Sequence, residues 1–278
     1  MGKDLDEIGK WSEDKLSLLG KYLNAYTTIM KKQRWCKGYY YVDAFAAIGR
    51  HKAKEAEKYI DGSPRVALKI KNPFTGYYFI EKDSNKIKKL QELKKEFHNR
   101  NISIDEGDCN QVLRDKIIPR FQNDRFLRAF VFLDPYGLDV EMKTLKEIAK
   151  TKAMEAFINF PVMPINRTIR SSNPDIKTRK EIERMNRVMG DEKWADENFV
   201  DQIPLFEDMA EIPIPRDWQN WVTSYKNRLR QIFPEVGTPL VMRNNKKAPL
   251  YALIFAGHKA KARKIMDDIF KKYQRLGS

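Results

Sequence analysis

The sequence predicts an α/β fold: a mostly parallel sheet of seven strands with an antiparallel last strand, together with a helical insertion. Five short apolar runs alternate with helical patterns along the first 165 residues, and two more flank a polar turn near the C-terminus. The five runs are continuously apolar, which is typical of parallel strands covered by helices on both faces. At 278 residues the chain is long enough to bury a core around such a sheet.

The N-terminal segment, 1–37, is predicted to contain one amphipathic helix from about Trp11 to Lys32. Its apolar residues recur at spacings of three and four, the period of a helix with one buried face. We expect Ser12 to cap this helix, with Glu13 and Asp14 in its first turn, where acidic side chains are favourable. The apolar residues that set the period are Leu16, Leu19, Tyr22, Leu23 and Tyr26.

The segment 38–165 is predicted to be the ligand-binding core. Strands that alternate with helices favour βαβ units and therefore parallel strands. Helical patterns begin at Ser63, Ser84, Cys109 and Lys143. The five strands are expected at 39–45, 77–82, 102–107, 129–134 and 155–160.

The rest of the chain divides into a helical insertion, 166–233, and a C-terminal unit, 234–278. The insertion has basic helical stretches, a proline-rich passage at 211–218 and no convincing strand, and we assign it to recognition of a substrate or partner. In the C-terminal unit, two apolar runs around the polar turn 244–247 predict a hairpin. A last helix from about Ala260 follows, so the unit completes the core.

Charge is the most informative feature of the composition. The chain has 53 Lys and Arg against 38 Asp and Glu, a formal net charge of +15, and a pI near 9.6. This surplus, together with 12% aromatic residues, favours a DNA or RNA partner, because phosphates pair with cations and bases stack on rings. A plain solvated surface is the alternative.

Composition also narrows the class of protein. No apolar run approaches the roughly 18 residues of a membrane helix, and the N-terminus lacks a signal-peptide core, so we expect a cytoplasmic protein without a membrane partner. Two cysteines, Cys36 and Cys109, and three histidines are too few for a disulfide framework or a four-ligand zinc site. We therefore expect no metal.

Acidic residues follow four of the predicted strands at their carboxyl ends, where ligands bind in a doubly wound sheet. Glu81 is placed to accept the two hydroxyls of a ribose; the alternative is a surface pair with Lys82 or Lys86. Asp108, followed by Cys109, could accept from an adenine amino group; the alternative is a helix N-cap. The four acids are Asp43, Glu81, Asp108 and Asp134.

The turn after the first strand has small residues where backbone could pass close to a ligand. After Asp43 the chain reads Phe45-Ala46-Ala47-Ile48-Gly49, and Gly49 can adopt a positive φ. An ordinary turn is the alternative. Further on, Asp61-Gly62-Ser63-Pro64 is expected to start a helix, although its amide groups could also meet an anionic ligand.

The stretch Asp134-Pro135-Tyr136-Gly137 is the sharpest motif in the sequence. A carboxylate and a neighbouring carbonyl can hold an exocyclic amine by its two hydrogens, while the aromatic ring stacks on the base. These features predict that Asp134, Pro135 and Tyr136 present an amine for chemistry, with Gly137 beside the substrate. A strand-end turn is the alternative.

Other residues could contact a substrate. Asn159 and Pro161 follow the fifth strand and could line its pocket, or they could simply end the strand. A basic stretch could contact phosphates or form a solvated helix face. The basic residues are Arg167, Arg170, Lys177, Arg179 and Lys180.

The order of these motifs resembles that of class I S-adenosylmethionine-dependent methyltransferases, which have a Rossmann-like core. More closely, Trp11-Ser12, VDAFA, GSPRVAL, FIEKD, GDCN, FLDPYGL and PLYALIFAGHKAKARKI resemble the three-Cys-motif partner proteins (TcmP) of bacteria and archaea. This resemblance spans nearly the whole chain and implies a radical-SAM-like protein partner. It implies that S-adenosylmethionine binds across 43–49, with further contacts from Glu81, Lys82, Asp108, Cys109 and Asp134.

Two narrower similarities concern the substrate. Asp134-Pro135-Tyr136-Gly137 is similar to the Asp-Pro-Phe-Gly of tRNA guanine-N2 dimethyltransferases and, less closely, to the Asp-Pro-Pro-Tyr of adenine-N6 methyltransferases. Both imply methylation of an exocyclic amine. One departure is Ala47, where the family has glycine: its methyl group could crowd the cofactor or require a costly φ.

Three other functions stay open. A non-catalytic nucleic-acid-binding or partner-docking protein would account for the departure at Ala47. A nicotinamide-dependent dehydrogenase fits the acid after the second strand, but Gly-x-Gly-x-x-Gly is absent and Asp-Pro-Tyr-Gly would go unexplained. A methyltransferase acting on protein or on a small molecule is the third.

Overall fold

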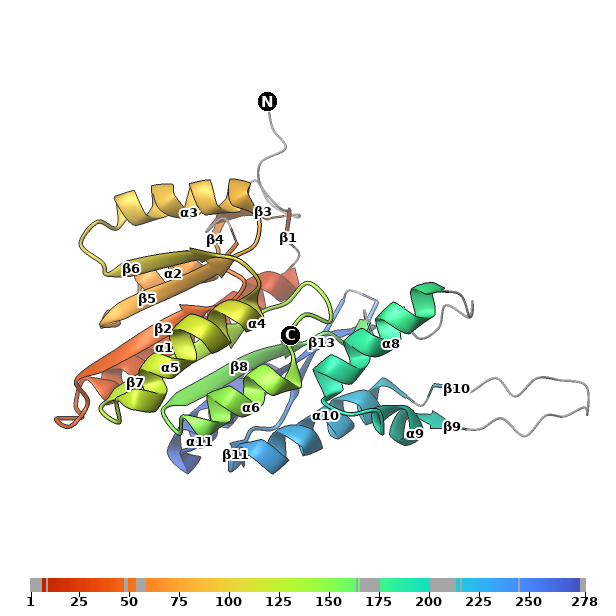
Figure 1. The fold of residues 1–278 in the computed structure, drawn as a ribbon. Coiled ribbons are helices and arrows are strands. Elements are labelled where there is room, and N and C mark those ends of the chain that lie inside the picture. Colours follow the sequence, from red (N-terminus) through yellow and green to blue (C-terminus); the bar gives the residue numbers. More distant parts are fainter. Residues whose placement is uncertain are drawn as a thin grey trace, which may run out of the picture.

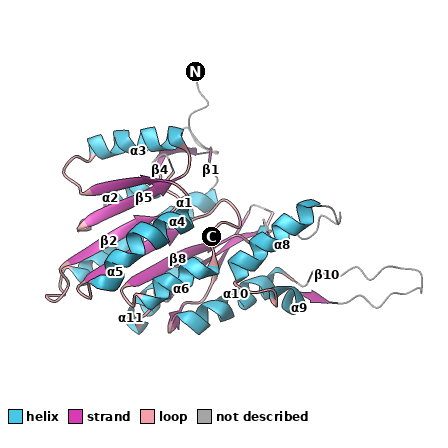
Figure 2. Cartoon of the chain, in the orientation of Figure 1, coloured by secondary structure: helices cyan, strands magenta, loops and turns pink. Residues whose placement is uncertain are grey.

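The computed structural model describes residues 7–8, 10–47, 50–53, 59–163, 165, 176–200, 214–215, 217–244 and 246–275. Its centre is an eight-stranded sheet (Figure 1 and Figure 2). In spatial order the strands are β6 (Ile102–Glu106), β5 (Gly76–Glu81), β2 (Gly38–Asp43), β7 (Leu127–Leu133), β8 (Met154–Phe160) and β13 (Pro249–Gly257), with β11 (Glu235–Val236) and β12 (Leu240–Arg243) both paired to β13.

The pairing confirms the predicted fold class. Strand β2 is parallel to β5 and β7, β5 to β6, and β7 to β8. Strand β13 is antiparallel to β8, β11 and β12. This mostly parallel order with an antiparallel last strand is the class I methyltransferase fold. The sheet has eight strands instead of the expected seven, because the outermost position is divided between the short strands β11 and β12.

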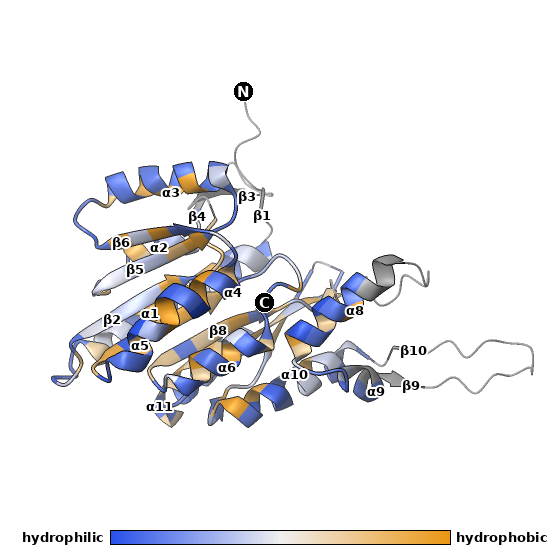
Figure 3. Cartoon of the chain, in the orientation of Figure 1, coloured by the Kyte–Doolittle hydropathy of each residue, from blue (hydrophilic) through white to orange (hydrophobic). Residues whose placement is uncertain are grey.

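Helices cover both faces of the sheet. One layer contains α1 (Lys10–Met30), α2 (Ser63–Leu68), α3 (Ser84–Glu96) and α11 (Ala260–Arg275). The other contains α4 (Cys109–Val112), the π-helix η1 (Leu113–Ile117), α5 (Ile118–Asn123), α6 (Met142–Lys150) and α10 (Trp218–Ile232). Figure 3 shows apolar and polar stripes on these helices. Successive residues of β2 alternate between the two cores: Tyr41 packs in the first, and Tyr40 and Val42 in the second.

Helix α1 differs from its prediction at the start. It begins at Lys10, so Ser12 lies inside the helix and is buried, and the expected N-cap at Ser12 is wrong. The buried face otherwise follows the apolar period. It also includes a lysine, Lys15, four residues before Leu19 and seven before Tyr22.

The segment 166–233 contains described helices and two short strands. Helices α8 (Ile176–Met189) and α9 (Trp194–Asn198) precede α10, and the two-residue strands β9 (Phe199–Val200) and β10 (Ile214–Pro215) pair with each other. A second small sheet joins β1 (Glu7–Ile8), β3 (Arg50–Ala53) and β4 (Tyr59–Asp61). Neither sheet was expected, because their sequences have no apolar run. Within the described ranges, no helix is long and apolar enough to cross a membrane.

Candidate functional site

The four predicted acids lie along one edge of the sheet, at the carboxyl ends of its parallel strands. Asp43 ends β2 and pairs in register with Phe132, two residues before Asp134. Glu81 ends β5 and pairs with Glu106, two residues before Asp108. Because neighbouring strands carry them, the acids follow one another along this edge in the order Asp134, Asp43, Glu81 and Asp108. Figure 1 shows the strands β7, β2, β5 and β6 in this order. We call this the carboxyl edge.

Asp43 is fully buried and shapes the turn that follows it. Its carboxylate accepts hydrogen bonds from the Tyr41 hydroxyl at 3.0 Å and from the Phe45 amide at 3.3 Å, and from the side chain of Ser63. The pKa of Asp43 is raised to about 7, mainly by burial and also by the nearby charge of Asp134, while these hydrogen bonds act in the other direction. Ser63, expected to start a helix, thus also fixes an acid of the site.

The turn 44–47 lies across the ends of the neighbouring strands. The Ala44 amide donates to the Phe132 carbonyl at 3.0 Å, and the Ala46 amide to the Ile80 carbonyl at 2.8 Å. Ala47 adopts no positive φ; among the described non-glycine residues only Lys152 and Lys247 do. The expected backbone cost at Ala47 is therefore wrong, while Gly49 lies outside the described residues.

Asp134 sits between two side chains from distant parts of the chain. One carboxylate oxygen pairs with the Lys15 ammonium at 2.5 Å, and the other accepts from the Asn159 amide at 2.6 Å. Lys15 also lies 6.0 Å from the Trp11 ring and 5.4 Å from the Tyr251 ring. The side chain of Lys15 is 8% exposed and that of Asp134 21%.

Lys15 is a residue of this edge that the sequence did not indicate. The sequence feature that could have indicated it is its spacing: Lys15 lies on the same buried face of α1 as Leu19 and Tyr22. A lysine there needs a partner, since an unpaired buried ammonium is very costly. The partner is 119 residues away, so no local pattern identifies it.

Asn159 has an unused acceptor. Its side-chain nitrogen donates to Asp134, which fixes the amide orientation, and its Oδ1 is buried without a hydrogen-bond partner among the described residues. An unsatisfied buried carbonyl costs about 1–3 kcal/mol. Asn159 is 6% exposed, and it lines a small pocket together with Pro135, Gly137 and Pro161. An incoming N–H group would remove that cost.

Tyr136 is an exposed ring beside this pocket. It is 72% exposed, the highest value among the described large apolar side chains. The Lys86 ammonium lies 5.0 Å from the centre of its ring. At Gly137 a Cβ would lie in ordinary van der Waals contact with the Asp139 carboxylate at 3.6 Å, so the position is bordered by the side chains of Asp139 and Arg184. Tyr136 therefore presents an exposed aromatic surface, with a cation beside it, next to the pocket of Asn159.

Glu81 and Asp108 each use one carboxylate oxygen to accept hydrogen bonds from backbone amides of the turn that follows. Glu81 Oε1 accepts from the amides of Lys82 and Asp83 at 2.7 and 3.0 Å. Asp108 is the N-cap of α4, and its Oδ1 accepts from Asn110 and Gln111 at 3.0 and 3.1 Å. The second carboxylate oxygen of each makes no hydrogen bond among the described residues.

The positions beside these acids differ in exposure. Lys82 is exposed, whereas Cys109 is buried, and burial raises the pKa of its thiol. Cys109 therefore packs behind the Asp108 cap, and only its backbone could reach a ligand bound there.

Asn110 was not predicted from the sequence, yet it fixes the segment after β7. It is buried, donates to the Asp139 carbonyl at 2.7 Å, and accepts from the Glu141 amide at 3.0 Å. Arg184 of α8 pairs with the Asp139 carboxylate at 2.9 Å. The predicted substrate contacts Arg167 and Arg170 lie outside the described residues.

Comparison with known proteins supports the fold. No protein-family model and no curated protein matches the chain. A Legionella pneumophila protein of the DUF519 family is 12% identical, with 94% of this chain and 92% of that one covered at a TM-score of 0.50. This likeness is one of fold alone.

Two looser similarities involve S-adenosylhomocysteine complexes. The N-terminal domain of EvdMO1, with S-adenosylhomocysteine and D-fucose, is 6% identical over 90% of this chain and 84% of that one, at a TM-score of 0.42. Rickettsia typhi PKMT2, also in complex with S-adenosylhomocysteine, is 10% identical. The similarity covers 85% of this chain and 52% of that one, at a TM-score of 0.38. None of the three similarities distinguishes the TcmP family.

Proposed function

We propose that the chain is an S-adenosylmethionine-dependent methyltransferase that methylates an exocyclic amine of a nucleic-acid base, adenine N6 or guanine N2. The observation that carries the proposal is the arrangement around Asp134. A carboxylate held on both oxygens lies beside an unsatisfied amide oxygen and is followed in the chain by an exposed tyrosine. This set is suited to holding an amine with two hydrogens on a flat ring.

The carboxyl edge fits the cofactor. The unused oxygens of Glu81 and Asp108 suit the ribose hydroxyls and the adenine amino group, and the turn after Asp43 provides small residues beside them. Residues 43–49, Lys82, Cys109 and Asp134 would complete that contact. When bound, S-adenosylmethionine supplies an electrophilic methyl group.

The protein groups position the acceptor amine. Asp134 and the free Oδ1 of Asn159 each accept one N–H, which directs the nitrogen lone pair away from both. Lys15 holds the carboxylate in one place. Because displacement at a sulfonium mainly needs alignment, no metal and no strong base are required, and the amine loses its proton after attack.

The proposed nucleic-acid substrate rests on charge and on Tyr136. The net charge of +15 attracts phosphates. The Tyr136 ring could stack on a base, a contact worth about 1–3 kcal/mol, while Lys86 close to the ring could meet the backbone.

A non-catalytic docking role is the second candidate. Both oxygens of Asp134 are already paired, as expected for a structural ion pair, and the resemblance to TcmP implies a radical-SAM-like partner. In that case the exposed Tyr136 and Arg184 would contact a protein.

A methyl-transfer assay separates the two candidates. The protein is incubated with radiolabelled S-adenosylmethionine and either unmodified RNA or DNA, alongside Asp134→Ala and the double variant Lys15→Met/Asp134→Ala, which leaves no stranded charge. We expect label in one nucleic acid with the native chain and none with either variant. Asp268→Ala, an exposed acid of α11, is the control. A double variant that folds and transfers methyl groups at the native rate would exclude a role for Asp134.

A further inference from the structure

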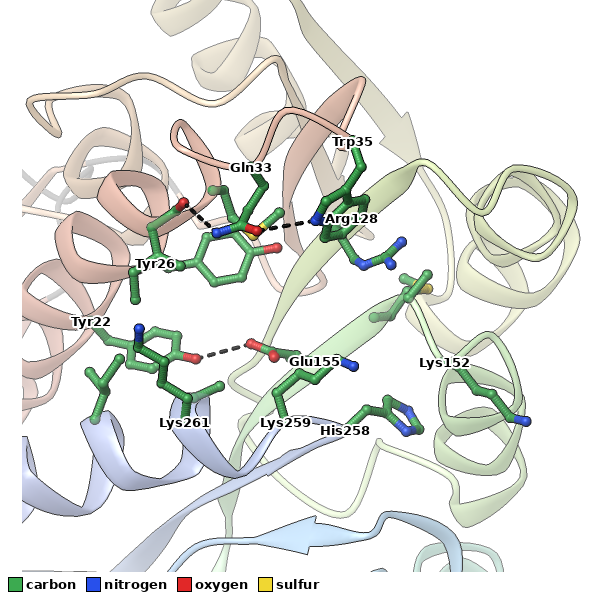
Figure 4. Close-up of a pocket in the computed structure, with 16 residues that line it drawn as sticks. Tyr22, Tyr26, Gln33, Trp35, Arg128, Lys152, Glu155, His258, Lys259 and Lys261 are labelled. Atoms are coloured by element: carbon green, nitrogen blue, oxygen red, sulfur yellow. Dashed lines mark hydrogen bonds between the residues drawn. The ribbon is translucent and has the colours of Figure 1, made fainter.

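A second cavity lies at the opposite edge of the sheet, between α1, α11 and the first residues of β7 and β8 (Figure 4). We call it the amino-edge pocket. Its volume is about 250 Å³. Glu155 in this pocket pairs in register with Phe130, four residues before Asp134. The two acids are therefore about 13 Å apart along the sheet, and the pocket is separate from the carboxyl edge.

The interior of the pocket is mostly apolar, with one carboxylate. The Tyr22 hydroxyl donates to Glu155 Oε2 at 3.0 Å (Figure 4). No described residue donates to Oε1. Burial raises the pKa of Glu155 to about 7, although Arg128 and Lys259 act in the other direction. The apolar walls are Tyr22, Tyr26, Ile29, Met30, Met154 and Ile265.

The mouth of the pocket is cationic. Arg128, Lys152, Lys259 and Lys261 line it, and the three lysines are exposed. Within the described part of the chain, none of the four forms an ion pair with a carboxylate. Arg128 instead donates to backbone carbonyls and lies 4.3 Å from the Trp35 ring. Four cations and one acid therefore line the pocket.

We infer that the amino-edge pocket binds a small zwitterion: a free α-amino acid with an apolar side chain. Its ammonium meets Glu155, its carboxylate meets the lysines of the mouth, and its side chain lies among the apolar walls. A cation is the ligand that best offsets the desolvation of a carboxylate in apolar surroundings. An anionic group likewise pairs with the lysines of the mouth, which have no carboxylate partner among the described residues.

Size supports this ligand class. Pockets for drug-sized ligands have about 300–1,000 Å³, and this one is smaller. A single amino acid suits the space better than a nucleotide, which also lacks an ammonium group. The inference does not depend on the proposed methyltransferase function, because it uses other residues at the other edge.

Calorimetric titration with L-leucine, L-methionine and L-phenylalanine at pH 8 tests the inference. For the probe that binds best, two analogues follow, one without the ammonium and one without the carboxylate; for leucine these are 4-methylpentanoate and isoamylamine. We expect each analogue to bind about tenfold more weakly or worse, since each loses a charge-assisted contact.

Matched variants locate the binding. Glu155→Gln and Lys259→Gln should each weaken binding about tenfold, whereas Glu92→Gln and Lys264→Gln, on exposed helix faces, should leave it unchanged. If Glu155→Gln unfolds, Ala262→Leu, which fills the pocket, should abolish binding instead.

Three results would overturn the inference. The first is no heat from any of the three amino acids up to about 10 mM. The second is equal binding of the analogue that lacks the ammonium. The third is unchanged binding by the folded Glu155 or Ala262 variant. S-adenosylmethionine titrated into Glu155→Gln gives an independent readout of the carboxyl edge, so failure here leaves the proposed function unaffected.

Discussion

The two edges of the sheet each hold a partly buried carboxylate, but the charge of the two is balanced in different ways. At the carboxyl edge, Asp134 forms an ion pair with Lys15 and accepts a hydrogen bond from Asn159. At the amino edge, Glu155 accepts one hydrogen bond from a described residue, the Tyr22 hydroxyl; Arg128 and Lys259 act on its charge but form no ion pair with it. A carboxylate that is already in an ion pair suits a neutral amine held by its hydrogens, whereas a carboxylate without an ion pair suits a cation.

One helix connects the two edges. Lys15 and Tyr22 lie seven residues apart on the buried face of α1, about two turns or 10 Å. The same apolar period that packs the helix therefore places one polar side chain at each edge.

The largest expected effect comes from breaking the ion pair at the carboxyl edge. Lys15→Met leaves Asp134 charged and partly buried, which should lower the free energy of unfolding by about 2–3 kcal/mol. Urea denaturation of the native chain and the variant measures this difference in the free energy of unfolding. Lys21→Met, on the exposed side of the same helix, controls for helix propensity; equal losses in both would mean that the pair contributes nothing.

Removing the exposed ring at this edge should affect activity without affecting stability. Tyr136→Ala should lower methyl transfer to nucleic acid about tenfold or more through lost stacking, with an unchanged melting temperature because the ring is 72% exposed. Trp35→Ala, at the other edge and 43% exposed, is the comparison for transfer rates. Similar losses for the two rings would remove the distinction between the edges.

The smallest effect concerns pH. Asp43 and Glu155 have pKa values raised to about 7 in the fold, so the folded chain holds more protons than the unfolded chain between about pH 4 and 7. Stability from these groups therefore falls as pH rises through that window. Glu155→Gln should reduce the loss of unfolding free energy between pH 5 and 8 by about 1 kcal/mol or more.

The control for this pH effect is Glu92→Gln, an exposed acid on α3. Unfolding free energies of both variants are measured at pH 5 and pH 8. Matching pH dependences in the two variants would show that Glu155 has an ordinary pKa.

The sheet could be predicted because its signals are local. Each of the five parallel strands is one apolar run, and an acid at the end of a run reaches the carboxyl edge as soon as strands are parallel. Asp43, Glu81 and Asp134 could therefore be assigned to one edge from sequence alone. The pairs β3–β4 and β9–β10 have no apolar run and were missed.

Other features depend on contacts across the chain. Lys15 meets Asp134 over 119 residues, and Tyr22 meets Glu155 over 133. Asn110 holds a segment about 30 residues later. The amino-edge pocket combines residues of α1, β7, β8 and α11, so no motif in the sequence could indicate it.

Calorimetric titration with S-adenosylmethionine and S-adenosylhomocysteine tests the central claim most directly, namely that the carboxyl edge binds this cofactor for methyl transfer. Glu81→Ala removes the proposed ribose contact, and Glu92→Ala is the matched acid on the exposed face of α3. We predict binding by the native chain and by Glu92→Ala, and binding weakened about tenfold or more by Glu81→Ala. Absence of binding to the folded native chain, or equal affinity in both variants, would contradict the account.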